Sequence, residues 1–235
     1  MRRLGTQLRS SLWEMTPRDH HQSDEEFRRR QVVSAFVVIV GAVVLGFSLR
    51  IEPGSVLFYY ATALLASVWA VGAFASGPLH LGRIGNPADP DRTAPRPVLQ
   101  PLLLGAALAI VFVLGALVVR EIPWLADQVR TVLRLAQQGN GVLLLLVTMV
   151  NGVAEELFFR GAMYAAIRKH QVLVTTVAYT LATLATGNVM LAFAAVVLGV
   201  IVGLQRRATG GILAPILTHL VWSVTMLYVL PAILL

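Results

Sequence analysis

The sequence predicts an all-α fold, a polytopic membrane bundle of about seven transmembrane helices (eight possible). Three observations lead to this prediction. Of the 235 residues, 57% are hydrophobic and only 13% are charged, and the mean hydropathy of +0.73 is too high for a water-soluble domain. The apolar residues gather in runs of roughly 20, the length that a helix needs to cross a hydrocarbon core about 30 Å thick. The basic residues lie between these runs.

The chain opens with a polar arm, residues 1–30, which mixes seven arginines with acids and is too long and too acidic for a cleavable signal peptide. We expect a partly disordered cytosolic arm, with binding of its short amphipathic pieces to the lipid surface as the alternative. Three clean apolar runs follow, then one that carries two carboxylates, then three more. The predicted spans are 31–49, 55–75, 98–119, 141–160, 172–186, 189–204 and 212–234.

Residues 123–138 leave the number of spans open. They have helical periodicity with Asp127 and two arginines on the polar side, which favours a helix lying on the membrane surface over an eighth span. The Pro-rich stretch 85–97 separates the first two spans from the rest. We therefore divide the chain into an arm (1–30), an accessory transmembrane pair with its linker (31–97) and a transmembrane core (98–235).

Positive charge sets the orientation, because Lys and Arg are retained on the cytoplasmic side of a membrane. With the amino terminus inside, the arm and three later loops hold 15 of the 19 basic residues: seven in the arm, three at 83–96, three at 160–169 and two at 206–207. This asymmetry supports an odd number of spans, with the amino terminus cytoplasmic and the carboxyl terminus outside. We expect an integral protein of a bacterial plasma membrane.

The composition also narrows the chemistry. The chain has no cysteine, which excludes disulfides, thiolate metal ligands and a cysteine nucleophile. Its net charge of +7 does not indicate nucleic acid as a partner, because no basic helix with interleaved aromatic residues occurs. The expected partner at this point is the lipid bilayer, and the oligomeric state is unknown.

Charged side chains inside a span indicate function, because each costs from about 2.5 kcal/mol upward in the bilayer core. Only the fourth span carries acids, Glu155 and Glu156, which point about 100° apart on a helix. Arg160 can pair with Glu156 four residues before it, which leaves Glu155 to face another side, toward Asn151. This pattern predicts one structural and one reactive carboxylate. The alternative is that both acids lie among lipid headgroups at a helix end, neutralised by nearby basic residues.

His219 alone among the five histidines lies within an apolar run. The topology puts it about 12 Å along its helix, at a depth similar to that of Glu155, which favours a shared site over a packing role. Ser223 lies one turn later on the same helix face. Pro215, four residues before the histidine, predicts a bend in this helix.

The string EELFFR, followed by an apolar span, a hairpin, a basic loop with TGG and then HLVWS, resembles the CAAX-processing and bacteriocin-processing (CPBP, or Abi) family of intramembrane proteases. The family pattern is EExxxR, then FxxxH, then HxxxN or a small polar residue, and the resemblance covers about residues 141–230. The second motif is degenerate here. Its best match is YTLAT, with Tyr179 as the aromatic residue and Thr183 in place of the histidine, and Thr186 is the alternative.

The resemblance implies a hydrolase, a membrane-embedded endopeptidase that cleaves a membrane-associated or lipidated protein or peptide. Glu155 would activate a water held near His219, and Asn151 or His219 would stabilise the oxyanion. Arg160 with Glu156 would hold the site together. The substrates suggested by the family are prenylated carboxyl termini or leader peptides.

The missing second-motif histidine bears on both cofactor and activity. Catalytic zinc usually takes three protein ligands, so a metalloprotease-like zinc site is doubtful and we expect no cofactor. If a metal binds, its ligands are Glu155 and His219. Thr183 cannot transfer a proton near neutral pH and could only position water. A non-catalytic member that binds and stabilises a membrane partner therefore stays open as the alternative, whereas a transporter has less support because no inverted repeat is visible.

Overall fold

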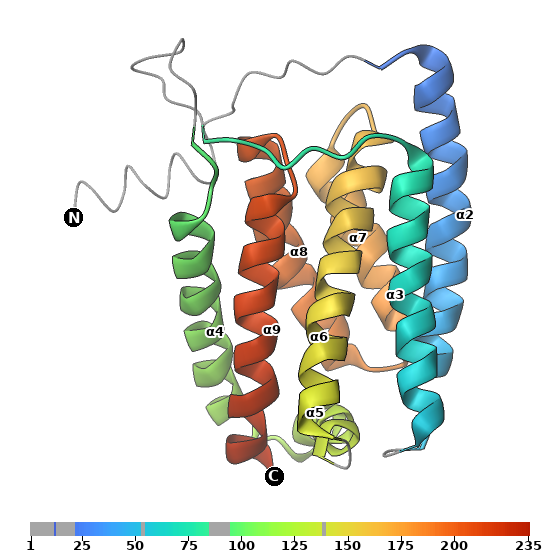
Figure 1. The fold of residues 1–235 in the computed structure, drawn as a ribbon. Coiled ribbons are helices and arrows are strands. Elements are labelled where there is room, and N and C mark those ends of the chain that lie inside the picture. Colours follow the sequence, from blue (N-terminus) through green and yellow to red (C-terminus); the bar gives the residue numbers. More distant parts are fainter. Residues whose placement is uncertain (1–11, 13–21, 53–54, 85–94, 138–139) are drawn as a thin grey trace, which may run out of the picture.

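The structure, a computed structural model, describes residue 12 and residues 22–52, 55–84, 95–137 and 140–235 (Figure 1). These residues form helices and no strand. In chain order the helices are α2 (Asp24–Ser48), α3 (Val56–Ser76), α4 (Leu99–Val119), α5 (Pro123–Gln137), α6 (Gly141–Glu156), the π-helix η1 (Leu157–Met163), α7 (Gln171–Leu184), α8 (Val189–Thr209) and α9 (Leu213–Leu234).

Six helical segments are long and apolar enough to cross a membrane: α2, α3, α4, the continuous pair α6 and η1, α8 and α9, each with 21 to 25 residues. α7 falls in the predicted fifth span but has only 14 residues. α5 has 15 residues and lies across one end of the bundle instead of running along it (Figure 1). The predicted polytopic helical bundle is confirmed, and α5 is not among the helices long and apolar enough to cross a membrane.

Six helices form a closed ring. α2 packs on α3, α3 on α6, α6 on α9, α9 on α8, α8 on α7, and α7 back on α2, while α4 packs against the outside of α9. The π-helix η1 contacts α2, α3, α7 and α8, so it fills the ring at the end where α2 begins. α5 contacts α4, α6, α8 and α9 at the opposite end. Side chains of α6, α7 and α9 are thereby directed into one shared interior.

Aromatic side chains form the core at the η1 end of the ring. The Trp69 ring of α3 stacks on Phe158 with centroids 4.9 Å apart, and Phe159 contacts Tyr179 of α7 at 4.9 Å. Phe158 and Phe159 are fully buried. This packing clamps η1 between α3 and α7, which fixes the side chains that follow the two glutamates.

α2 begins earlier than the sequence suggested. The Ser23 hydroxyl accepts from the Glu26 amide, and the Glu26 carboxylate accepts from the Ser23 amide at 2.7 Å, a capping box. Residues 24–30, assigned to the arm, are therefore helical. Most of residues 1–21 lie outside the described part of the chain, and the division into arm, accessory pair and core stays a prediction.

Pro215 does not bend its helix, so the expected bend was wrong. α9 begins at Leu213, which places Pro215 in the first turn, where a missing amide proton leaves no helical hydrogen bond unmade. The start of α9 is held from outside the helix, because the amide of Ile212 donates to the His80 carbonyl at 2.9 Å and that of Leu213 to Leu81 at 3.0 Å. The segment after α3 thus lies against the α8–α9 connection.

Candidate functional site

The site begins where α6 gives way to a π-helix. Glu155 and Glu156 end α6, and the next seven residues, Leu157–Met163, are π-helical. π-helical turns are rare and are frequently found at functional sites. Arg160 lies within this turn and is fully buried, as is Glu156. The wider turn therefore sets the direction of the side chains around the paired carboxylates.

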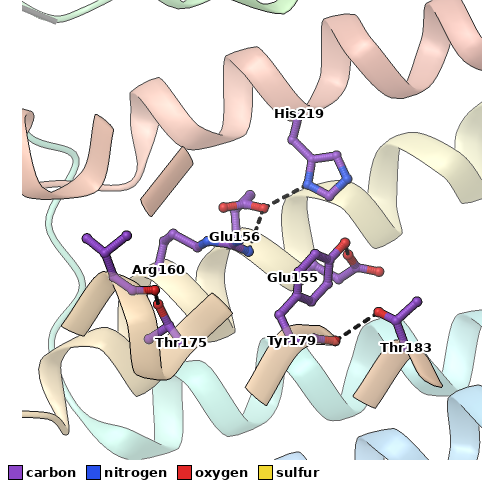
Figure 2. A network of polar contacts seen from close by, with 8 residues as sticks. Glu155, Glu156, Arg160, Thr175, Tyr179, Thr183 and His219 are labelled. Atoms are coloured by element: carbon purple, nitrogen blue, oxygen red, sulfur yellow. Dashed lines mark hydrogen bonds and ion pairs between the residues drawn. The ribbon is translucent and has the colours of Figure 1, made fainter. Parts of the chain in front are cut away.

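Glu156 joins η1 to α9 through one oxygen. Its Oε1 accepts a hydrogen bond from Nη1 of Arg160 at 3.1 Å and lies 2.8 Å from Nδ1 of His219 (Figure 2). The ion pair with Arg160 is the one that the spacing predicted. The histidine contact, however, goes to Glu156, whereas the sequence suggested Glu155. A carboxylate at Nδ1 favours the tautomer with the proton on that nitrogen, which leaves Nε2 as an acceptor.

Glu155 is held by a different helix. Its Oε2 accepts a hydrogen bond from the Tyr179 hydroxyl of α7 at 2.6 Å (Figure 2). Its other oxygen receives no hydrogen bond from the described residues, and the residue is partly exposed, unlike Glu156. The two adjacent carboxylates are thus divided between α9 and α7, and Glu155 is the one that is partly exposed and bonded only to a neutral hydroxyl.

Arg160 is surrounded by π faces and by a second arginine. Its guanidinium lies over the Tyr179 ring, 4.8 Å from the centroid, and its carbonyl accepts from Nε of Arg206 at 2.6 Å. Three polar atoms here have no protein partner in the described residues: Nε and Nη2 of Arg160 and Oε2 of Glu156.

The remaining predicted residues make local contacts. The Thr183 hydroxyl donates to the Tyr179 carbonyl at 2.9 Å within α7, and the Asn151 amide donates to the Val147 carbonyl at 2.9 Å within α6 (Figure 2 shows Thr183). Ser223 lines an apolar groove and makes no hydrogen bond within the described part of the chain. None of these three is hydrogen-bonded to the glutamates.

Sequence reasoning missed a buried polar chain beside His219. The Gln205 amide of α8 donates to the Thr218 hydroxyl at 2.9 Å, and that hydroxyl donates to the Pro101 carbonyl of α4 at 2.9 Å. Thr218 is fully buried. This chain ties α9 to two neighbours and fixes the rotation of the helix that carries His219. The signal in the sequence was a threonine next to the histidine in an apolar run.

The donor set does not fit a three-ligand zinc site. No group of three or more His, Cys, Asp or Glu residues that could hold a metal occurs among the described residues. Glu156 and His219 are already bonded to each other, and Arg160 brings a positive charge to the same carboxylate oxygen. The expectation that no cofactor is needed stays a prediction.

Residues 137–225 match the family model described as Type II CAAX prenyl endopeptidase Rce1-like. The matched segment runs from the last residue of α5 into α9 and contains both glutamates, Arg160, Tyr179 and His219. A comparison with curated proteins found no match, and neither did a comparison with solved structures.

Proposed function

We infer that this chain, whose residues 137–225 belong to the CAAX-type (CPBP) family of intramembrane proteases, is an integral membrane endopeptidase acting on a lipidated or membrane-associated protein. The observation that carries the proposal is the unequal bonding of the two glutamates. Glu156 is fully buried and paired with both Arg160 and His219, whereas Glu155 is partly exposed and its hydrogen-bond partner among the described residues is the neutral Tyr179 hydroxyl. Such a division supports one carboxylate that orients groups and one that accepts a proton.

In the proposed reaction, the available oxygen of Glu155 takes a proton from a water that also hydrogen-bonds Nε2 of His219. The hydroxide forms a bond to the carbonyl carbon of the scissile peptide, giving a tetrahedral oxyanion. The Asn151 amide stabilises that charge. The carbon–nitrogen bond then breaks as Glu155 returns its proton to the leaving amine. Tyr179 positions the base by donating to its other oxygen.

The description of the matching family model, a CAAX prenyl endopeptidase, suggests the substrate class to test. We propose a prenylated peptide ending in a CAAX sequence as the first substrate and a membrane-bound leader peptide as the second. The positive-charge asymmetry supports access from the cytoplasm, in a bacterial plasma membrane. The η1 end of the ring would then face the cytoplasm.

The test is cleavage of an internally quenched prenylated CAAX peptide by the full chain in liposomes. The parent should cleave it, and Glu155→Gln should be at least about 100-fold slower while unfolding at the same temperature. A variant that cleaves as fast as the parent would contradict the role of Glu155. If the parent binds the peptide and no leader or CAAX substrate is cut, the chain is a non-catalytic member that binds its partner.

Metal dependence is tested separately. Because the donor set does not fit a three-ligand zinc site, we expect cleavage to survive prolonged dialysis against a chelator. The measurement compares the rate before dialysis, after it, and after zinc is restored. A loss that zinc reverses would show that the metal expectation is wrong and would point to Glu155 and His219 as ligands.

A further inference from the structure

A polar cavity lies at the end of the bundle where α2 begins, and the paired glutamates do not line it. Its volume is about 460 Å³, and it is bounded by the first turns of α2, the residues after α3, the η1–α7 connection and the end of α8. We refer to it as the basic cavity. Its lining includes four arginines and two acids: Arg29, Arg30, Arg168, Arg206, Asp24 and Glu26. This excess of positive charge favours an anionic occupant.

The two acids already have partners of their own. Glu26 accepts from the Ser23 amide in the capping box, and Asp24 lies 3.3 Å from Nη2 of Arg168. Among the described residues neither acid forms a salt bridge with Arg30. Glu26 also attracts Arg30 and Arg29 through its charge. Because two acids face four arginines, they offset only part of the positive charge of the basic cavity.

Arg30 is one of two buried arginines in the lining of the basic cavity and is 5% exposed. Its Nη2 donates to the Pro78 carbonyl at 3.2 Å, and the guanidinium lies against Gly77, where a side chain would collide with it. Its Nε is buried without a hydrogen-bond partner. A buried cation with an unused donor is costly, and an anion that accepts from it would offset that cost.

The depth of Arg30 suggests which anion. Arg30 comes directly before the apolar stretch of α2, whose large hydrophobic residues on one face are exposed: Val32, Phe36, Ile39, Val43 and Phe47. In a bilayer the basic cavity would therefore lie where apolar chain meets headgroup, the level of lipid phosphates. Planar guanidinium groups donate paired hydrogen bonds to phosphate oxygens. We propose that the basic cavity binds a phosphate group, carried by an anionic phospholipid or as free phosphate.

The experiment measures ligand retention on the purified full chain by native mass spectrometry. Phosphatidylglycerol is compared with a neutral glycolipid of the same acyl chains, and inorganic phosphate is added as a competitor. Arg30→Gln is the test variant. Arg28→Gln is the matched control, because it removes the same charge from an exposed position on the same helix that does not line the basic cavity.

We expect the parent and Arg28→Gln to retain phosphatidylglycerol over the glycolipid and Arg30→Gln to retain it about tenfold less. If the parent retains both lipids equally and millimolar phosphate lowers that retention, the site binds free phosphate. Equal retention of both lipids with no effect of phosphate overturns the proposal. An unchanged preference in Arg30→Gln also overturns it. If Arg30→Gln does not fold, Arg29→Gln replaces it, because Arg29 is exposed and lines the same cavity.

Discussion

At the scale of single residues, Glu156 is the most constrained group of the site. One of its oxygens meets a guanidinium and an imidazole from two helices, and the carboxylate and guanidinium are both fully buried. Removing one charged group from a buried ion pair leaves the other buried without a counter-ion. The stability lost is then larger than the net stability that the ion pair contributes. Glu155, with a neutral phenol as its hydrogen-bond donor, is under no such constraint.

Glu156→Gln should therefore lower the free energy of unfolding by about 3–5 kcal/mol, because Arg160 would stay buried without its counter-ion. Glu155→Gln should change it by less than about 1 kcal/mol, since an amide oxygen can still accept from Tyr179. Detergent-induced unfolding of the two variants measures the difference. Equal losses of stability would contradict the assignment of Glu156 as the structural carboxylate.

Tyr179→Phe tests whether the hydroxyl on Glu155 positions the base. The ring and its contacts with Phe159 and Arg160 are kept, so stability should hold. Loss of the 2.6 Å hydrogen bond should lower kcat about tenfold with little change in KM. Tyr228→Phe, on the exposed face of α9, is the control. An equal fall of kcat in both variants would contradict a positioning role specific to the Tyr179 hydroxyl.

At the scale of helices, the position of His219 depends on how closely α4 approaches α9. A side-chain carbon on Gly105 would lie 2.8 Å from the Thr218 carbonyl and 2.9 Å from Val221, which is closer than real contacts allow. The glycine therefore permits the close packing in which Thr218 reaches the Pro101 carbonyl. Small residues allow such contacts between membrane helices.

Gly105→Ala should destabilise the bundle by about 1–3 kcal/mol and slow cleavage, because α4 is pushed from α9 and the histidine is displaced. Gly115→Ala is the matched control on the same helix, where an added carbon meets no atom within 4 Å and stability should change by less than about 0.5 kcal/mol. Unfolding and cleavage assays on both variants measure these effects. Equal behaviour of the two variants would remove the packing argument.

At the scale of the whole molecule, the closed ring brings residues from distant parts of the chain into one interior. α6, α7 and α9 each supply one part of the site, and η1 closes the ring at the end where α2 begins. The α2–α3 connection lies at the opposite end from the η1–α7 connection (Figure 1). Which end of the ring faces the cytoplasm stays a prediction, drawn from the distribution of positive charge alone.

Single cysteines can test the orientation cleanly, because the chain has none of its own. Glu52→Cys is exposed between α2 and α3, and Lys169→Cys is exposed between η1 and α7. In intact cells a membrane-impermeant maleimide should label the first and spare the second. Inverted vesicles should give the reverse. The opposite pattern would place the η1 end of the ring outside the cell.

The sequence by itself determined the features that depend on near neighbours. Apolar runs long enough to cross a bilayer predicted the bundle, and the spacing of four residues predicted the Glu156–Arg160 pair, because both follow from the rise and turn of a single helix. It also put a glutamate and His219 at matched depth, because depth follows from counting residues along a span.

Only the tertiary structure decided which glutamate His219 contacts. Neighbouring residues on a helix point about 100° apart, so a modest rotation of α6 or α9 would exchange Glu155 for Glu156. That rotation is set by contacts between segments distant in sequence: the aromatic packing that clamps η1, and the buried chain from Gln205 through Thr218 to α4. The π-helix and the Tyr179 contact have the same origin, since neither follows from local spacing.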